Sequence, residues 1–202
     1  HPRKLLAYAC SNYYTKKPKN IIGVTGTNGK TSIANFYYQI LAYNKKKVAS
    51  IGTLGVISKK FKLQTKNTTI DSLNIHKILH KLKVSKIENV IIESSSHGLK
   101  QHRLDNINFN TAIFTNLSRD HLDYHKTFKD YINSKLILFN RLLNYKGNII
   151  FDNKIPQAKI LNLISTKRKL KKYNFSGKKP FFDIIKIQQV NNKKKVDILI
   201  KN

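Results

Sequence analysis

The stretch that decides the fold is "NIIGVTGTNGKTSIANFYYQIL", residues 20–41. It opens with a short apolar run typical of a buried strand, and a glycine-rich turn follows. Apolar residues then recur at the spacing of a helix that buries one stripe, namely at Ile33, Phe36, Tyr37, Ile40 and Leu41. A strand, a glycine-rich loop and a helix in this order predict a phosphate-binding loop.

The residues of this loop suit a nucleotide phosphate. Unpaired N–H groups at a helix start, together with the helix dipole, favour an anion there. Lys30 can bridge the β- and γ-phosphates of ATP, and the Thr31 hydroxyl can bind Mg²⁺. The strict pattern has glycine at position 24, where this chain has Val24 and carries its glycine one residue earlier, at Gly23. The loop is therefore a variant of the pattern.

The amino-acid composition limits the classes of protein to which this chain can belong. The chain has 202 residues, of which 40% are hydrophobic and 10% aromatic, enough for a sizeable core. Its formal charge of +29 would suit a polyanion, but the lysines are spread along the chain and are not gathered in a patch. We therefore expect no specific nucleic-acid partner. With one cysteine, Cys10, no signal peptide and no apolar run near the roughly 18 residues of a membrane span, we expect a cytoplasmic protein without membrane attachment.

The rest of the chain alternates strands with helices. A helical lead-in precedes the loop at 1–19, and further strands are predicted at 47–51, 88–93, 111–115 and 148–152. Helices are predicted at 72–82, with Ile75, Ile78, Leu79 and Leu82 on one face, and at 128–143. Two strands around an Asn-Asn turn are expected at 181–200. This order predicts an α/β fold: a mainly parallel sheet flanked by helices, with an antiparallel extension near the C-terminus.

Polar residues gather where predicted strands end. Glu93 ends the strand at 88–93 and can hold Mg²⁺, although a carboxylate at a helix start explains it equally well. The segment "NLSRDHLDYH" (116–125) follows the next strand, and its carboxylates and histidines can hold a second metal and orient phosphates. His97 alone is expected to be structural. Lys135 alone is expected to be one more surface lysine.

Taken together, the motifs "GVTGTNGKTS", "NTTIDS", "ESSSHGLKQHR" and "FTNLSRDHLDYH", with a later helical "SK", resemble the Mur ligase family in order and spacing. The resemblance covers roughly residues 1–153. It implies an ATP-dependent amide ligase of peptidoglycan precursor synthesis that works through an acyl phosphate. The members it most resembles add a diamino acid, meso-diaminopimelate or L-lysine, to UDP-N-acetylmuramoyl-L-alanyl-D-glutamate.

The resemblance also implies a role for each motif residue. ATP would be bound by Gly26, Thr27, Asn28, Gly29, Lys30, Thr31 and Ser32. Mg²⁺ would be held by Thr31, Glu93, His121 and Lys135, the last as a lysine carbamylated by CO₂. The muramoyl peptide would be bound by Asn67, Thr68, Thr69, Ser95, Gln101 and Arg103. The catalytic residues would be Lys30, His121 and Lys135. The proline usual after the two threonines is Ile70 here.

Mur ligases have three domains, and the resemblance implies only the central one here. We expect residues 1–202 to form this ATP-binding domain, truncated near its C-terminal end, with 1–19 leading in from an N-terminal domain. We expect such a fragment to be monomeric and inactive alone. Two alternatives stay open: a related ligase of the folylpolyglutamate synthase type, and a basic P-loop NTPase that binds nucleic acid.

Overall fold

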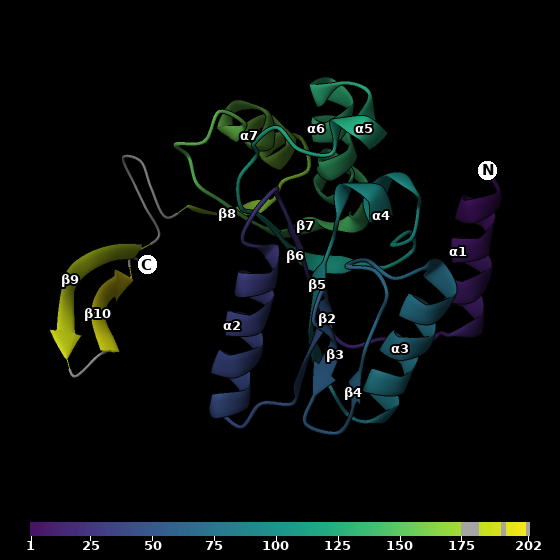
Figure 1. Ribbon diagram of the computed structural model, residues 1–202, viewed down its shortest axis with the longest axis horizontal. Coiled ribbons are helices and arrows are strands. Elements are labelled where there is room, and N and C mark those ends of the chain that lie inside the picture. The colour runs from purple at the N-terminus through teal and green to yellow at the C-terminus, as the bar shows by residue number, and fades with distance from the viewer. Residues whose placement is uncertain (175–181, 191–192, 201–202) are drawn as a thin grey trace.

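The computed structural model describes residues 1–174, 182–190 and 193–200, and its main feature is an eight-stranded sheet with helices packed around it (Figure 1). The strand order is β4-β3-β2-β5-β1-β6-β7-β8. The strands are β1 Asn20–Thr25, β2 Val48–Gly52, β3 Gly55–Ser58, β4 Lys62–Leu63, β5 Asn89–Glu93, β6 Phe109–Phe114, β7 Leu143–Phe151 and β8 Lys171–Asn174.

The sheet is mainly parallel, as predicted. Strands β2, β5, β1, β6, β7 and β8 pair in parallel, whereas β3 and β4 add an antiparallel edge beside β2. The predicted antiparallel pair near the C-terminus is also found, as β9 (Phe182–Val190) and β10 (Lys193–Ile200). These two strands form a sheet of their own and do not extend the main one. The expected Asn-Asn turn at 191–192 lies outside the described residues.

Helices connect the strands, and most match the prediction. They are α1 Pro2–Tyr13, α2 Lys30–Tyr43, α3 Ser72–Val84, α4 Ser96–Lys100, α5 Leu122–His125, α6 Phe128–Ile137 and α7 Ala158–Lys167. The single helix predicted at 128–143 is α6 followed by a π-helical turn at Leu138–Leu142. Strand β7 starts directly after that turn, at Leu143, five residues earlier than predicted. Six of these elements were not predicted from the sequence: β3, β4, α4, α5, α7 and β8.

The two faces of the sheet carry separate clusters of buried side chains. Alternate residues of β5 point to opposite faces: Val90 and Ile92 join the large cluster, and Ile91 joins a small one with Val24 and Ala34. Helix α3 buries the whole predicted stripe in the large cluster. Helix α2 covers the small one.

The predicted apolar stripe of α2 is wrong at two positions. Phe36 and Ile40 are 59% and 61% exposed, and the only fully buried residue of the helix is Ala34. Ile33 and Tyr37 pack against the small cluster through partly buried side chains. The face of α2 that packs on the sheet therefore includes fewer residues than the apolar spacing of its sequence predicts.

Among the described residues, no helix is long and apolar enough to span a bilayer.

The buried His76 is expected to make the stability of this fold sensitive to acid. It is fully buried on α3, and its Nε2 lies 3.1 Å from the carbonyl oxygen of Asp105. Burial, helped by the nearby Lys17 cation, lowers the pKa of His76 to about 4. The neutral His76 ring therefore makes its full contribution to the free energy of unfolding above the ordinary histidine pKa of about 6.5. This contribution is lost as the pH falls towards 4.

We therefore predict that between pH 7 and pH 4.5 the chain loses about 2–3 kcal/mol of unfolding free energy that His76→Gln does not lose. Glutamine keeps a donor for the Asp105 carbonyl and does not titrate in this range. Urea unfolding of both proteins at the two pH values measures the difference. Equal losses in the two proteins would show that His76 does not cause the acid sensitivity.

Candidate functional site

The predicted phosphate-binding loop lies where β1 ends and α2 begins. Two of its glycines have left-handed backbone angles, Gly26 with φ 148° and Gly29 with φ 84°. A Cβ at Gly26 would lie 1.9 Å from Thr115 Oγ1, so only glycine fits there. No side chain caps the start of α2, as is also the case for α1, α5 and α7, whereas α3, α4 and α6 are capped by Asp71, Ser95 and Thr127. The uncapped N–H groups of α2 fit an anion such as a nucleotide phosphate.

The segment after β6 holds the loop in shape. The Thr27 and Asn28 N–H groups donate to the backbone and side-chain oxygens of Asn116, at 3.0 and 2.9 Å. The Thr115 hydroxyl donates to the Asn28 carbonyl at 2.7 Å, and Thr27 exchanges hydrogen bonds with Ser118. The loop is thus preorganised by residues about 90 positions away. The segment was predicted from the sequence to lie at the site, but Thr115, Asn116 and Ser118 were not among the predicted site residues.

The shifted glycine, Gly23, is not part of the loop. It lies inside β1, where a Cβ would come within 2.8 Å of Leu138 and 3.0 Å of Phe109 side-chain atoms. Gly23 therefore allows close packing beneath the loop, and the departure from the strict pattern leaves Gly26 and Gly29 to shape the loop itself.

Lys30 lies over the loop that it follows. Its Nζ donates to the carbonyl oxygens of Gly26 and Thr27, at 3.0 and 2.7 Å. Burial lowers the pKa of Lys30, while the nearby carboxylates of Glu93 and Asp120 act in the opposite direction. The amine is thus held next to the helix start, where a bound phosphate would need a cation.

Glu93 lies at the end of β5, beside the loop, and is 2% exposed. Its Oε2 accepts hydrogen bonds from the hydroxyls of Thr31 and Thr53, at 2.8 and 3.1 Å, and its Oε1 accepts from the Thr53 N–H at 3.0 Å. None of the ion pairs among the described residues includes Glu93. A buried carboxylate bonded only by neutral donors and next to the Thr31 hydroxyl fits a hard divalent cation such as Mg²⁺.

Gly52 leaves the space that Glu93 occupies. A Cβ at Gly52 would lie 2.0 Å from Glu93 Oε1, so Gly52→Ala must displace the carboxylate. Since a hydrogen bond to a charged group contributes about 1.5–3 kcal/mol, we predict at least a ~10-fold loss of Mg²⁺-dependent nucleotide affinity. Calorimetry with and without Mg²⁺ measures this. An unchanged Mg²⁺ dependence in the folded variant would contradict a metal role for Glu93.

The histidines of the site form an aromatic cluster, not a preformed metal site. The His97 ring lies 5.0 Å from that of His121, 5.3 Å from that of His125 and 4.1 Å from that of Tyr124. His125 is fully buried, and its Nε2 lies 3.0 Å from Ser96 Oγ. The described residues include no group of three His, Cys, Asp or Glu side chains arranged for a metal. The metal role expected for segment 116–125 therefore stays a prediction.

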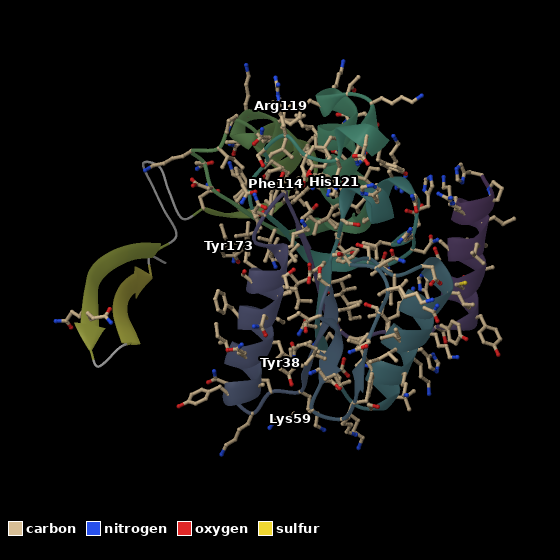
Figure 2. The ribbon with its side chains drawn as sticks, in the orientation of Figure 1. Tyr38, Lys59, Phe114, Arg119, His121 and Tyr173 are labelled. Atoms are coloured by element: carbon tan, nitrogen blue, oxygen red, sulfur yellow. The ribbon has the colours of Figure 1, made fainter. Side chains whose placement is uncertain are left out.

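Of these histidines, His121 stays accessible. Its side chain is 49% exposed, and its Nε2 lies 3.4 Å from Asp120 Oδ2. Figure 2 shows His121 and Arg119 at one end of the molecule, and Tyr38 and Lys59 at the other. His121 lies beside Tyr131, whose hydroxyl contacts Thr27 Oγ1 of the loop at 3.1 Å.

Lys135 is not the surface lysine that its sequence context alone predicts. Its side chain is 1% exposed, and its Nζ donates to the Gly26 carbonyl at 2.7 Å and lies 4.3 Å from the centre of the Tyr131 ring. Burial, then the charge of Lys30, lower the pKa of Lys135 to about 7, with Asp120 acting in the opposite direction. The packing of α6 thus brings this amine against the phosphate-binding loop.

The residues expected to bind a peptide substrate are mostly bonded to one another. Thr69 is buried, and its hydroxyl donates to the Glu93 carbonyl at 2.7 Å and accepts from the Ser95 N–H at 2.9 Å. Arg103 donates to Gln101 Oε1 and to the Thr69 carbonyl, so its guanidinium already has partners. These contacts join segment 65–70 to the end of β5 and to the residues on either side of α4.

Two surface cavities lie near these residues. One of about 250 Å³ is lined by three of the predicted residues, Asn67, Gln101 and Arg103, together with Arg3, Leu6, Asp71 and Ser72. Another of about 300 Å³ shares Asn67 and Asp71 with it. A larger cavity, of about 580 Å³, lies between α1 and residues 105–108 and contains none of the predicted site residues.

Comparison with known proteins agrees with this geometry. The family model described as Mur ligase middle domain matches residues 24–202. The chain belongs to the Mur ligase family. Its fold is similar to a solved structure titled UDP-N-acetylmuramoyl-L-alanyl-D-glutamate–2,6-diaminopimelate ligase, with a TM-score of 0.81 at 26% identity over 98% of this chain and 41% of that one.

Curated relatives in the Mur ligase family bear the same name. The ligase of Brucella melitensis is 44% identical over 142 residues, which are 70% of this chain and 29% of the relative. That of Rickettsia bellii is 41% identical over 175 residues, 84% of this chain and 36% of the relative. The chain thus spans about a third of the length of these relatives. A Mycobacterium tuberculosis folylpolyglutamate synthase complexed with ADP shares the fold, with a TM-score of 0.74 at 12% identity over 98% of this chain and 51% of that one.

Proposed function

We propose that this chain is the central ATP-binding domain of an ATP-dependent amide ligase that adds a diamino acid to UDP-N-acetylmuramoyl-L-alanyl-D-glutamate. The observation that carries the proposal is that Lys30, Glu93 and Lys135 all lie around the glycine loop and the uncapped start of α2, at one end of the sheet. Meso-diaminopimelate is the favoured amine, because the relatives named above are 2,6-diaminopimelate ligases. L-Lysine is the second candidate.

The proposed reaction has two steps. A carboxylate oxygen of the dipeptide bonds to the γ-phosphorus of ATP as the bond to ADP breaks, which gives an acyl phosphate. The amine then attacks the acyl carbon, loses a proton, and phosphate leaves with the carboxylate oxygen. Both steps bring anions together, so catalysis consists mainly of positioning and charge neutralisation.

Each residue of the site has a part in this scheme. The N–H groups of residues 26–32 bind the phosphates, and the Lys30 amine leaves its carbonyl partners to contact the transferring phosphoryl group. Thr31 and Glu93 would hold a Mg²⁺ ion, which supplies charge neutralisation when bound. His121 is proposed as a ligand of a second Mg²⁺. Asn67, Thr68, Thr69, Ser95, Gln101 and Arg103 would bind the muramoyl peptide beside the cavity of about 250 Å³.

Lys135 is proposed to act as a carbamate. Its neutral amine adds to CO₂ through a new N–C bond and loses a proton, which turns a buried cation into an anion. The lowered pKa of about 7 supports this step, since it leaves much of the amine neutral. The anion would give up the Gly26 carbonyl and serve as a ligand of Mg²⁺.

The setting of the enzyme is part of the proposal. We propose a cytoplasmic monomer that acts on soluble precursors, without a nucleic-acid or membrane partner. The alternative, a P-loop NTPase that binds nucleic acid, predicts that the protein binds RNA or DNA in a salt-sensitive way. It also predicts that RNA or DNA stimulates ATP hydrolysis. Neither is expected here.

The direct test is product formation by the intact ligase from ATP, UDP-N-acetylmuramoyl-L-alanyl-D-glutamate and each amine in turn. We expect an amide with meso-diaminopimelate and a slower or absent reaction with L-lysine. A folate with glutamate is the control substrate pair for the folylpolyglutamate synthase alternative. Ligation of the folate pair and not of the muramoyl pair would overturn the proposal.

The 202-residue chain alone is predicted to form no amide. The loop is local, so the chain is expected to bind nucleotide weakly, whereas the family resemblance assigns the uridine nucleotide and the amine to the N-terminal and C-terminal domains of such ligases. Positioning of the reactants accounts for about 7–11 kcal/mol of such barriers. The same assay with the chain in place of the intact ligase measures this. Turnover by the chain would show that the domain assignment is wrong.

A further inference from the structure

Thr53 connects the two halves of the proposed site and had no role in the sequence analysis. It lies in the two-residue turn between β2 and β3, next to Gly52. Its N–H and hydroxyl both bond the Glu93 carboxylate, at 3.0 and 3.1 Å. The same hydroxyl lies 3.0 Å from the Thr68 hydroxyl and 3.4 Å from that of Thr31. The exposed Thr53 side chain thus contacts both Glu93, a proposed metal ligand, and Thr68, a proposed peptide-binding residue.

The Glu93 carboxylate can only accept, so the Thr53 and Thr31 hydroxyls are the donors in their bonds to Glu93 Oε2. When Thr53 donates to Glu93, its oxygen is left to accept from the Thr68 hydroxyl, 3.0 Å away. These contacts link Thr68 through Thr53 to Glu93, and in such a chain each bond polarises the next.

The peptide side is tied to Glu93 at a second point. Thr69, the neighbour of Thr68, donates its hydroxyl to the Glu93 backbone carbonyl at 2.7 Å. Segment 65–70 therefore contacts the backbone of Glu93 through Thr69 and its carboxylate through Thr68 and Thr53. A ligand that engages the Thr68 hydroxyl competes with the contact between Thr68 and Thr53, the residue that also bonds the carboxylate.

We infer that Thr53 is a positioning residue that couples occupancy of segment 65–70 to the placement of the Glu93 carboxylate, and so to Mg²⁺–nucleotide binding. The inference rests on the proposed function, since it takes the muramoyl dipeptide as the ligand of that segment. Coupling of this kind is reciprocal: each ligand changes the affinity of the other by the same factor.

The experiment measures binding, not turnover. Calorimetry on the intact ligase gives the affinity for a non-hydrolysable ATP analogue with Mg²⁺, with and without saturating UDP-N-acetylmuramoyl-L-alanyl-D-glutamate. In the wild type we expect the two affinities to differ by about 5-fold or more. Thr53→Val keeps the side-chain shape and removes the hydroxyl, and we expect it to reduce the ratio to below about 2-fold. Thr53→Ser keeps the hydroxyl and should retain the wild-type ratio.

Leu54→Ala is the matched control, because Leu54 is the other residue of the turn and is 52% exposed. It should keep the wild-type ratio. A Thr53→Val protein that keeps the ratio, or a wild type that binds both ligands independently, would overturn the inference and leave the proposed function standing. A wild type that does not bind the dipeptide would instead overturn the proposed function. Thermal unfolding of each variant checks that it is folded.

Discussion

Lys30→Ala in the intact ligase is expected to lower the rate of ligation by at least about 10²–10³-fold while the fold stays intact. The Lys30 amine is held over the loop by the carbonyls of Gly26 and Thr27, beside the uncapped start of α2. From there it is proposed to turn from these carbonyls to the γ-phosphoryl group, so its removal takes away a cation that lies next to the transfer. Steady-state ligation of the muramoyl dipeptide measures the loss, and circular dichroism checks the fold.

The control for Lys30 is a lysine that lies away from the site. Lys59 is exposed at the far end of the molecule, and Lys59→Ala should ligate like the wild type (Figure 2). Near-normal turnover by purified Lys30→Ala protein would exclude this loop as the site of phosphoryl transfer.

Lys135→Ala is expected to lower ligation by about 10²-fold or more, the effect of losing one preorganised electrostatic contact. Small carboxylates such as acetate should restore part of the activity, because the shortened side chain leaves room for an anion where the carbamate would lie. An unmodified surface lysine predicts neither effect. Trapping of the carbamate by chemical methylation, followed by mass spectrometry, would identify the modification itself.

Two variants separate this effect from a packing defect. Lys135 is buried, so Lys135→Ala also opens a cavity. Lys135→Met fills most of that space and cannot be carbamylated, so it should be as inactive as Lys135→Ala and gain nothing from acetate. Lys129→Ala changes an exposed lysine of the same helix and should be fully active. Normal turnover by Lys135→Met would end the carbamate proposal.

The parts of the site that sequence predicts are those made by neighbours in the chain. Strand β1, the glycine loop and α2 are contiguous, so the spacing of a few glycines and apolar residues is enough to predict them. Glu93 could be placed at the site because the carboxyl ends of parallel strands share one edge of the sheet. The apolar stripe predicted for α3 was correct because it, too, depends only on the spacing of residues within one helix.

The parts that sequence does not predict depend on packing between distant segments. The Asn116 contacts to the loop arise only when β6 pairs with β1, and the burial of Lys135 only when α6 packs against the loop. Thr53 lies in a short turn at an antiparallel edge that has no strong pattern. Phe36 and Ile40 carry the spacing of a buried stripe, yet α2 meets the sheet through Ala34 and its neighbours.

The central claim is that this site activates a carboxylate as an acyl phosphate, and oxygen labelling tests it most directly. The muramoyl dipeptide would be prepared with ¹⁸O at both oxygens of the carboxylate that becomes the amide, and ligated to meso-diaminopimelate by the intact enzyme with unlabelled ATP. Because the oxygen that attacks the γ-phosphorus leaves with it, the account predicts one labelled oxygen in each phosphate released. Amide formation with unlabelled phosphate, or phosphate release without amide, would contradict it.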